Sequence, residues 1–231
     1  MCLQNLFCET VKLEFILDQP IIEDVTYESN ATSEEECEKH LIDVGFILTP
    51  QELKREGKFL DCKFRVEVNH FDDKFLSQKK INKISKTLLS NPLNIAYCQN
   101  NNDLDECSAD GKLEKAMENA NLDVILQDLF STIIPLADLE LYEGKSGIIY
   151  PEESKYYWLN YNVVKIDEEH VDICMEIGGK KSLNLTGFIN ARFNRENAMI
   201  HDISISYKTT YLFLWWEESE EVTILFSSKE I

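Results

Sequence analysis

The side chains best suited to chemistry occupy alternate positions of the strands expected in the last third of the chain. One such group comprises His170, Asp172, Asn184, Asn190, Arg192 and Asp202. Imidazole, carboxylate and guanidinium groups that converge in one hollow can bind a small ligand or move a proton. The group therefore predicts an alternative ligand site on the polar face of the C-terminal sheet, in an enzyme or a small-ligand-binding protein.

The histidines do not have the spacing of a metal site. No two of them share an HxH or HxxxH spacing, and they lie at His40, His70, His170 and His201. His170 and His201 both fall near strand starts beside acidic residues, but alternation puts His170 in the polar phase of its strand and His201 in the apolar phase. The sequence therefore predicts ordinary strand-edge roles for both residues.

The chain contains no strong catalytic, nucleotide or metal motif. No serine lies in a GxSxG motif, and the seven cysteines form no CxxC pair or metal-finger spacing. Glu106, Ser108, Asp110 and Gly111 imitate the start of a calcium-binding loop, but Met117 takes the twelfth position, where a bidentate glutamate is required. We therefore expect no catalytic residue, no cofactor and no metal.

Charge is distributed unevenly along the chain, whose formal charge is −19 from 42 acidic and 23 basic residues. Residues 1–49 contain 11 acidic and 2 basic residues, residues 50–90 contain 6 and 10, and residues 91–231 contain 25 and 11. Such a field repels nucleic acid and anionic membranes over most of the surface, whereas it accelerates encounter with a basic protein. We predict a basic protein partner, and neither nucleic acid nor membrane as a partner.

Acidic residues cluster at residues 34–38, 103–106, 167–169 and 217–221. The last cluster is the preferred partner-binding site because aromatic residues stand beside its carboxylates; this site comprises Trp215, Trp216, Glu217, Glu218, Glu220 and Glu221. The leading prediction is a non-enzymatic acidic binding or inhibitor protein that covers a basic partner such as a nuclease or another toxin. Immunity proteins and nucleic-acid mimics work in this way, whereas a solvated acidic surface is the simpler alternative.

The basic segment contains an amphipathic helix, expected over residues 73–89. Its apolar face contains Ile81, Ile84 and Leu88, and lysines occupy the rest of its surface at positions 79, 80, 83 and 86. These lysines could contact phosphate, but no aromatic residue is interleaved among them. We interpret them as a solvated face that also pairs with the protein's own acidic residues.

The first half of the chain is expected to combine strands with short helices. Alternating apolar residues predict strands over residues 11–17 and 60–68, whereas residues 24–32 read as a polar connection. A capping box precedes a helix expected over residues 33–44. A proline at the first helical position starts another expected helix, over residues 50–57.

The second half is expected to begin with a helix and continue as a sheet. Residues 99–110 lack apolar periodicity and predict a loop, after which residues 113–134 keep helical spacing. Short alternating runs over residues 156–227 predict an antiparallel β-meander with a two-residue hairpin turn at Gly178-Gly179. Residues 212–216 are apolar in both phases, which predicts that residues 211–216 lie near the centre of the sheet or beneath a covering helix.

These elements predict an α+β fold in which the C-terminal antiparallel β-meander packs against helices from the N-terminal half. We expect a single domain over residues 1–231, with a possible sub-boundary in loop 99–110 between a mixed lobe (1–98) and a helix-plus-meander lobe (111–231). No targeting segment is evident, and the odd number of scattered cysteines favours a reducing compartment. A cytoplasmic protein is therefore expected, while its oligomeric state stays open.

Overall fold

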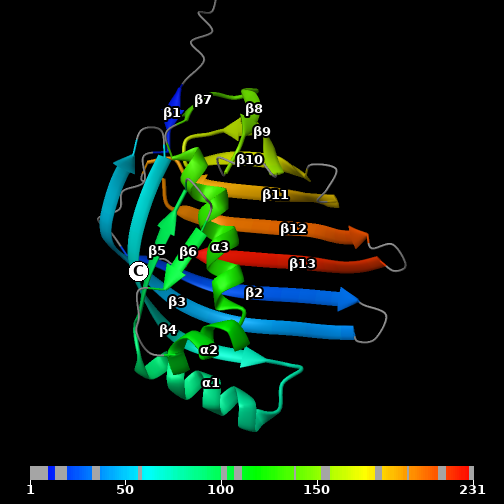
Figure 1. Ribbon diagram of the computed structural model, residues 1–231. Helices are drawn as coiled ribbons and strands as arrows, with labels where there is room; N and C mark the ends of the chain where they lie inside the picture. The colour runs from blue at the N-terminus through cyan, green and yellow to red at the C-terminus, as the bar shows by residue number, and fades with distance from the viewer. Residues whose placement is uncertain are drawn as a thin grey trace, which may run out of the picture.

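In the computed structural model, the described residues form one sheet of eleven strands in which every neighbouring pair is antiparallel (Figure 1). The structure describes residues 10–13, 20–32, 37–56, 59–99, 103–106, 111–137, 139–151, 157–179, 184–196, 198–212 and 217–228. From edge to edge the order is β6 (Asp103–Glu106), β5 (Leu93–Cys98), β4 (Phe59–Asp73), β3 (Cys37–Glu56), β2 (Ile21–Thr32), β13 (Glu217–Ser228), β12 (Ile200–Leu212), β11 (Asn184–Asn194), β10 (His170–Gly179), β9 (Tyr157–Ile166) and β8 (Ser146–Ile149). A separate pair is formed by β1 (Val11–Lys12) and β7 (Glu140–Leu141).

The two halves of the chain meet in the middle of this sheet, where β2 pairs with β13. Val25 of β2 lies opposite Phe226 of β13, and both side chains are buried. Apolar residues alternate along strands such as β2 and β10, so one face of the sheet is apolar and the other is polar. The strands of the first and second halves therefore share a single core.

In the described part of the chain, three α-helices and a short 3₁₀ helix lie on the apolar side of the sheet. They are α1 (Gln78–Ser90), α2 (Gly111–Asn119), α3 (Leu122–Ile133) and η1 (Ile134–Leu136). The sheet curves around α3, which crosses its concave face (Figure 1). Phe130 of α3 stacks on Phe64 of β4 with a ring-centroid distance of 4.7 Å and lies 5.4 Å from Tyr97 of β5. The concave face and α3 thus form the main core.

The α+β class predicted from the sequence is wrong, because the first half contributes mostly strands. Residues 24–32 belong to β2 and not to a polar connection, and residues 37–56 form the long strand β3 where two helices were expected. Ile42, Val44, Phe46 and Leu48 alternate along β3, and all four are fully buried. A cap stabilises a helix by about 1 kcal/mol, whereas burial of each of these side chains contributes about 1.5–3 kcal/mol.

Two local predictions in the second half also fail. Gly178 and Gly179 do not form a hairpin turn, because both belong to the end of β10 and pair with Trp158 and Tyr157 of β9. A Cβ on Gly178 would lie 2.3 Å from the Trp158 ring, so glycine is needed for close packing between strands. Part of the expected loop 99–110 forms the edge strand β6. Residues 213–216 of the expected sheet centre lie outside the described residues.

The helices of the second half agree better with their sequence pattern. Asn121 has a φ of 48°, in the left-handed region, and separates α2 from α3. The apolar stripe of α3 is buried against the sheet and includes Ile125, Leu129 and Phe130. Among the described residues, none of the helices combines the length and the apolar character needed to cross a lipid bilayer.

Candidate functional site

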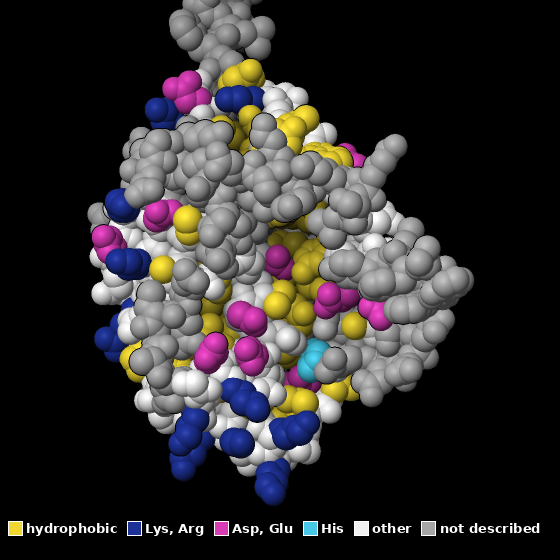
Figure 2. All heavy atoms as spheres, in the orientation of Figure 1, with side chains coloured by type: hydrophobic (Ala, Val, Ile, Leu, Met, Phe, Trp, Pro, Cys, Tyr) yellow, Lys and Arg dark blue, Asp and Glu magenta, His cyan; other side chains and the backbone are white. Residues whose placement is uncertain are grey.

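A cavity of about 230 Å³ lies between α3 and the concave face of strands β9 to β12; we call it the concave cavity. Its apolar wall consists of residues that occupy the inward phase of their strands, namely Leu159, Ile177, Leu185, Ile189 and Ile205. The remaining lining is more polar and comprises Asp128, Ser131, Thr132, Tyr157, Tyr207 and Thr209. Figure 2 shows hydrophobic side chains in the hollow in the middle of this face. The concave cavity is therefore an apolar pocket with a few polar groups at its boundary.

Among the described residues that line the concave cavity, Asp128 alone carries a carboxyl group. The hydroxyl of Tyr207 donates a hydrogen bond to this carboxyl, but the Oδ2 atom of Asp128 is buried and has no hydrogen-bond partner. Burial disfavours the charged form and raises the pKa of Asp128 to about 7. Asp128 thus changes its protonation state near neutral pH and retains an unused hydrogen-bonding position.

Two buried tyrosines stand beside this carboxyl group. Burial raises the pKa of Tyr27 to about 12, and it raises the pKa of Tyr207 further, with the Asp128 charge adding to the effect. Both phenols therefore stay neutral and can donate hydrogen bonds at physiological pH. The charge of Glu220 raises the pKa values of Asp128, Tyr27 and Tyr207, which places Glu220 close to this group.

A second, polar cavity of about 400 Å³ adjoins these residues, and we call it the polar cavity. Tyr27 and Glu220 line it, together with Lys80 from α1 and Lys115 from α2. The polar cavity lies between the sheet and the α1–α2 end of the molecule, beside the basic part of the chain. The acidic and basic side chains at this end are visible in Figure 2.

Glu23 is the most deeply buried carboxyl group of the described residues. It is 0% exposed, it occupies the inward phase of β2 with Val25, and neither of its oxygens has a hydrogen-bond partner. Burial, with a smaller effect from the charge of Asp24, raises its pKa to about 8. Glu23 is therefore mostly neutral at pH 7, and its ionisation would cost stability.

The acidic cluster predicted as a partner-binding site is divided between the two faces of β13. Glu220 lines the polar cavity, whereas Glu221 faces outward and accepts a hydrogen bond from Lys208 at 2.9 Å. Glu217 and Glu218 lie opposite Leu212 and Tyr211 in the β12–β13 pairing. Trp215 and Trp216 lie outside the described residues. Binding of a basic partner by this segment stays a prediction, but these glutamates do not share one surface.

Three residues of the alternative ligand site form a row across the convex face. Arg192 of β11 lies opposite both Asp172 and Asp202, and its Nε donates to Asp172 Oδ1 at 2.7 Å. Asn190 is on the same face, opposite Cys174. Asn184 lies eight residues from Arg192 along the strand, a distance of about 26 Å. The structure therefore gathers only part of this site.

A β-bulge brings His170 and His201 together, although their strand phases were expected to differ. The pairing of β11 with β12 shifts between Arg192 and Phe193, so Ile200 and Ile203 are buried while His201 turns outward. The two imidazole rings meet edge to face with a centroid distance of 5.0 Å. Within the described residues, no three side chains of His, Cys, Asp or Glu are arranged to hold a metal ion.

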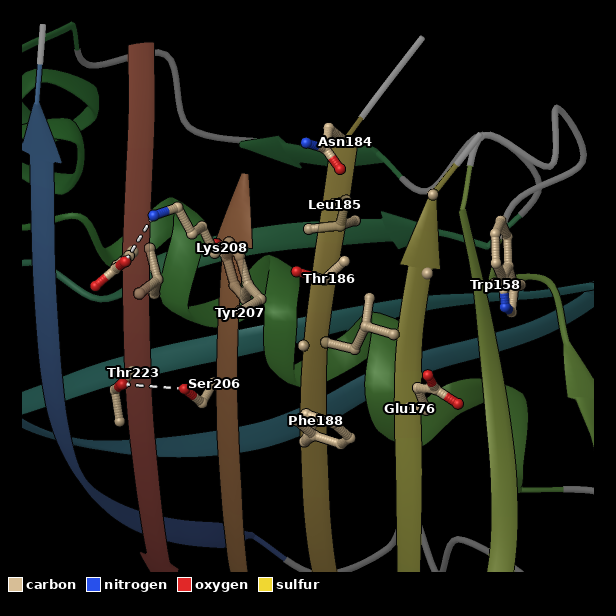
Figure 3. A pocket seen from close by; sticks show the side chains of 16 residues that line it. Trp158, Glu176, Asn184, Leu185, Thr186, Phe188, Ser206, Tyr207, Lys208 and Thr223 are labelled. Atoms are coloured by element: carbon tan, nitrogen blue, oxygen red, sulfur yellow. Dashed lines mark hydrogen bonds and ion pairs between the residues drawn. The ribbon is translucent and has the colours of Figure 1, made fainter. Parts of the chain in front are cut away.

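A wide, open hollow occupies the convex side of β9 to β13 near one end of the strands (Figure 3). Trp158, Glu176, Asn184 and Phe188 contribute to its lining, and Phe188 is 66% exposed. Lys208 pairs with Glu221 there, and the hydroxyls of Ser206 and Thr223 lie 3.4 Å apart. Four polar side chains of this hollow are thus paired with each other, whereas the Oδ2 atom of Asp128 in the concave cavity has no hydrogen-bond partner.

Sequence reasoning missed Asp128, Tyr207, Tyr27 and Glu23 as residues of interest. A signal existed for two of them, because Glu23 interrupts the inward phase of β2 and Asp128 lies next to the buried stripe of α3. A carboxyl group at an apolar position is unusual unless it is paired or functional. The strand containing Glu23 was read as a connection from residue 24 onward, so its phase was not recognised.

No protein-family model and no curated protein matches the chain. Among solved structures, the chain resembles one described as lipid–protein interactions in lipovitellin, with a TM-score of 0.51 and 9% identity. The match covers 94% of this chain but 26% of the lipovitellin chain, so the protein spans about a quarter of that length. A DUF1329 family protein from Desulfovibrio piger aligns with 8% identity over 91% of this chain and 85% of that one, but its TM-score of 0.20 is too low to carry structural meaning. At 9% identity, the similarity to lipovitellin shows a shared fold alone.

Proposed function

We propose that the protein binds a small amphipathic molecule in the concave cavity, with an apolar body and one hydroxyl or amine hydrogen-bond donor. The buried, unpartnered Oδ2 of Asp128 at the edge of an apolar cavity carries this proposal. An unpaired buried acceptor costs about 1–3 kcal/mol. A ligand that donates a hydrogen bond to this oxygen removes that cost while its apolar part fills the cavity.

The size of the concave cavity limits the ligand. An apolar cavity of about 150 Å³ takes up benzene, and the concave cavity has about 230 Å³. By proportion, a ligand that fills it has about nine non-hydrogen atoms. Octan-1-ol meets both the size and the requirement for a donor.

The comparison with lipovitellin supports an apolar ligand. The solved lipovitellin structure concerns lipid–protein interactions, and its fold resembles the fold of this chain. The proposal therefore moves the ligand from the convex residues suggested by the sequence to the opposite face of the same strands.

The free thiols support the cytoplasmic location expected from the sequence. Cys62, Cys98 and Cys174 are not in disulfides, and Cys62 is buried in the core. A protein that keeps such cysteines reduced suits a reducing compartment. Its ligand would then be an apolar molecule of the cell interior.

Calorimetric titration with linear alcohols from butan-1-ol to dodecan-1-ol tests the proposed function. Each added methylene should raise the affinity about fourfold while the cavity fills, and the gain should stop near octan-1-ol. Leu185→Trp places a large side chain on the cavity wall and should abolish binding. Leu225→Trp on the convex face, where Leu225 is exposed, is the matched control and should bind normally. Affinity that is independent of chain length, or equal in both variants, would refute the proposal.

A further inference from the structure

A groove between α1 and α2 gathers positive charge in this acidic protein. It has a volume of about 360 Å³ and an apolar floor that includes Ile84 and Ala116. Its rim carries four lysines, namely Lys80, Lys83, Lys112 and Lys115. Like charges repel each other when they are brought together, so this arrangement favours an anion in the groove.

Three lysines of this groove differ from four other lysines of the protein. Lys12, Lys63, Lys165 and Lys208 each form an ion pair with a carboxylate. Within the described part of the chain, Lys80, Lys83 and Lys115 form no such pair. Residues 74–91 contain five lysines and no acidic residue. The basic groups of α1 are therefore available to an external anion. The sequence had predicted that they also pair with the protein's own acidic residues, but within the described residues they form no such ion pair.

Two exposed apolar side chains flank this basic surface. Phe75, just before α1, is 58% exposed, and Leu89 near the end of α1 is 47% exposed. Between them, the outer face of α1 carries Lys79, Lys83 and Lys86. The main apolar face of α1 is buried in the protein, but its outer surface still combines the two features of an interfacial helix, namely basic residues for anionic lipids and large apolar residues for the interface.

We propose that α1 and the α1–α2 groove dock the protein on an anionic lipid bilayer. The lysines bind the phosphate groups of lipid headgroups, while Phe75 and Leu89 enter the interface. The net charge of −19 does not prevent this contact, because salt screens charges beyond about 8 Å under physiological conditions. An acidic protein or a nucleic acid would match the lysines but would gain little from the two apolar side chains.

The position of this surface also suggests that docking serves the transfer of a ligand from the bilayer. Lys80 and Lys115 line both the groove and the polar cavity, and the polar cavity adjoins the residues around Asp128. A molecule that leaves the bilayer at α1 would therefore first reach the polar cavity, beside the residues around Asp128. Docking itself is independent of the proposed function, whereas its use for ligand transfer rests on that function.

Flotation of the full chain with phosphatidylcholine vesicles, with or without about 30 mol% phosphatidylserine, tests docking. Only the anionic vesicles should retain the protein. A triple variant, Lys80→Gln with Lys83→Gln and Lys115→Gln, should lose at least tenfold in vesicle binding, since each lysine near such a surface contributes about fivefold. The control, Lys12→Gln with Lys63→Gln and Lys208→Gln, changes the net charge equally and should retain binding.

Further measurements distinguish docking on an anionic bilayer from binding of free phosphate, of neutral lipid or of DNA. Phe75→Ser with Leu89→Ser leaves the charge unchanged and should still lower vesicle binding. Equal loss in the two lysine variants, retention by neutral vesicles, or calorimetric binding of inorganic phosphate without vesicle binding would overturn the proposal. So would a duplex DNA competitor that binds the groove more tightly than the vesicles do.

Octan-1-ol binding without vesicles distinguishes the two proposals. The groove variant should bind octan-1-ol normally, which also shows that it is folded. If the wild-type protein binds octan-1-ol but does not bind anionic vesicles, the docking proposal is refuted and the proposed function is not. If the wild-type protein binds anionic vesicles but does not bind octan-1-ol, the proposed function is refuted and the docking proposal is not.

Discussion

Carboxyl groups on the two faces of the sheet have opposite environments. On the concave side, burial raises the pKa values of Glu23 and Asp128 to about 8 and about 7. In the turn between β9 and β10, the pKa of Asp167 lies well below its ordinary value because Lys165 and two backbone N–H groups donate hydrogen bonds to it. On the convex side, the carboxylate of Asp172 accepts hydrogen bonds from Arg192. Burial thus favours the neutral form of Glu23 and Asp128 on the concave side, whereas Asp172 is held in an ion pair on the convex side.

This contrast indicates which face is committed to a task other than stability. Exposed ion pairs contribute about 0–1 kcal/mol each, so the convex pairs mainly keep an exposed sheet surface soluble. Buried carboxyl groups without partners reduce stability. Groups that are retained despite such a cost are concentrated at functional sites, which favours the concave face as the place where function resides.

The substitution Glu23→Leu is expected to have the largest effect on stability. Because the folded-state pKa of Glu23 is raised from 4.5 to about 8, wild-type stability should fall as pH rises from 4.5 to 8, where only the unfolded chain is ionised. The shift corresponds to about 5 kcal/mol. Above pH 8, urea denaturation should therefore give Glu23→Leu a free energy of unfolding about 3–5 kcal/mol higher than that of the wild type.

The substitution Glu28→Leu provides the control for this measurement. Glu28 lies on the same strand with its side chain on the exposed face. Its replacement should leave the loss of stability between pH 4.5 and pH 8 intact, whereas Glu23→Leu should remove most of it. Identical pH profiles for the two variants would show that Glu23 is not the group responsible.

Asp128→Asn is expected to have a smaller effect, on ligand binding. The pKa of Asp128 is raised to about 7, so its carboxylate form becomes dominant as pH rises through 7. A hydrogen bond from an alcohol to a carboxylate is stronger than one to a neutral group by about 1 kcal/mol. Octan-1-ol affinity should therefore rise about fivefold from pH 6 to pH 8 in the wild type and stay constant in Asp128→Asn. A pH-dependent affinity in the variant would assign the titration to another group.

Elements with uninterrupted periodicity could be predicted from the sequence. The helix expected over residues 73–89 is present as α1, with Ile81, Ile84 and Leu88 buried. Val171, Ile173, Met175 and Ile177 alternate along β10 and are buried as their spacing predicts. These patterns suffice because one regular period fixes which side chains share a face.

The remaining features depend on contacts that local patterns do not encode. The alternation of Ile42 to Leu48 was visible in the sequence, but nearby capping signals favoured a helix, and only pairing with β2 and β4 stabilises the strand. One bulge residue reverses the phase at His201. The concave cavity arises from the way α3 crosses β9 to β12, so its lining residues come from segments far apart in the chain.

Glu220 and Glu221 offer the finest comparison of the two faces, because they are neighbours in β13. Glu220 lines the polar cavity, and its charge helps to raise the pKa of Asp128, whereas Glu221 pairs with Lys208 on the convex side. Removal of a nearby like charge favours ionisation. Glu220→Gln should therefore lower the pKa of Asp128 by about 0.3 unit, and Glu221→Gln should leave it unchanged. Carbon-13 NMR of the Asp128 carboxyl group measures both shifts. Equal shifts in the pKa of Asp128 in the two variants would show that its pKa depends on the total charge of β13 and not on the face that carries the charge. The sheet would then not separate the two faces electrostatically.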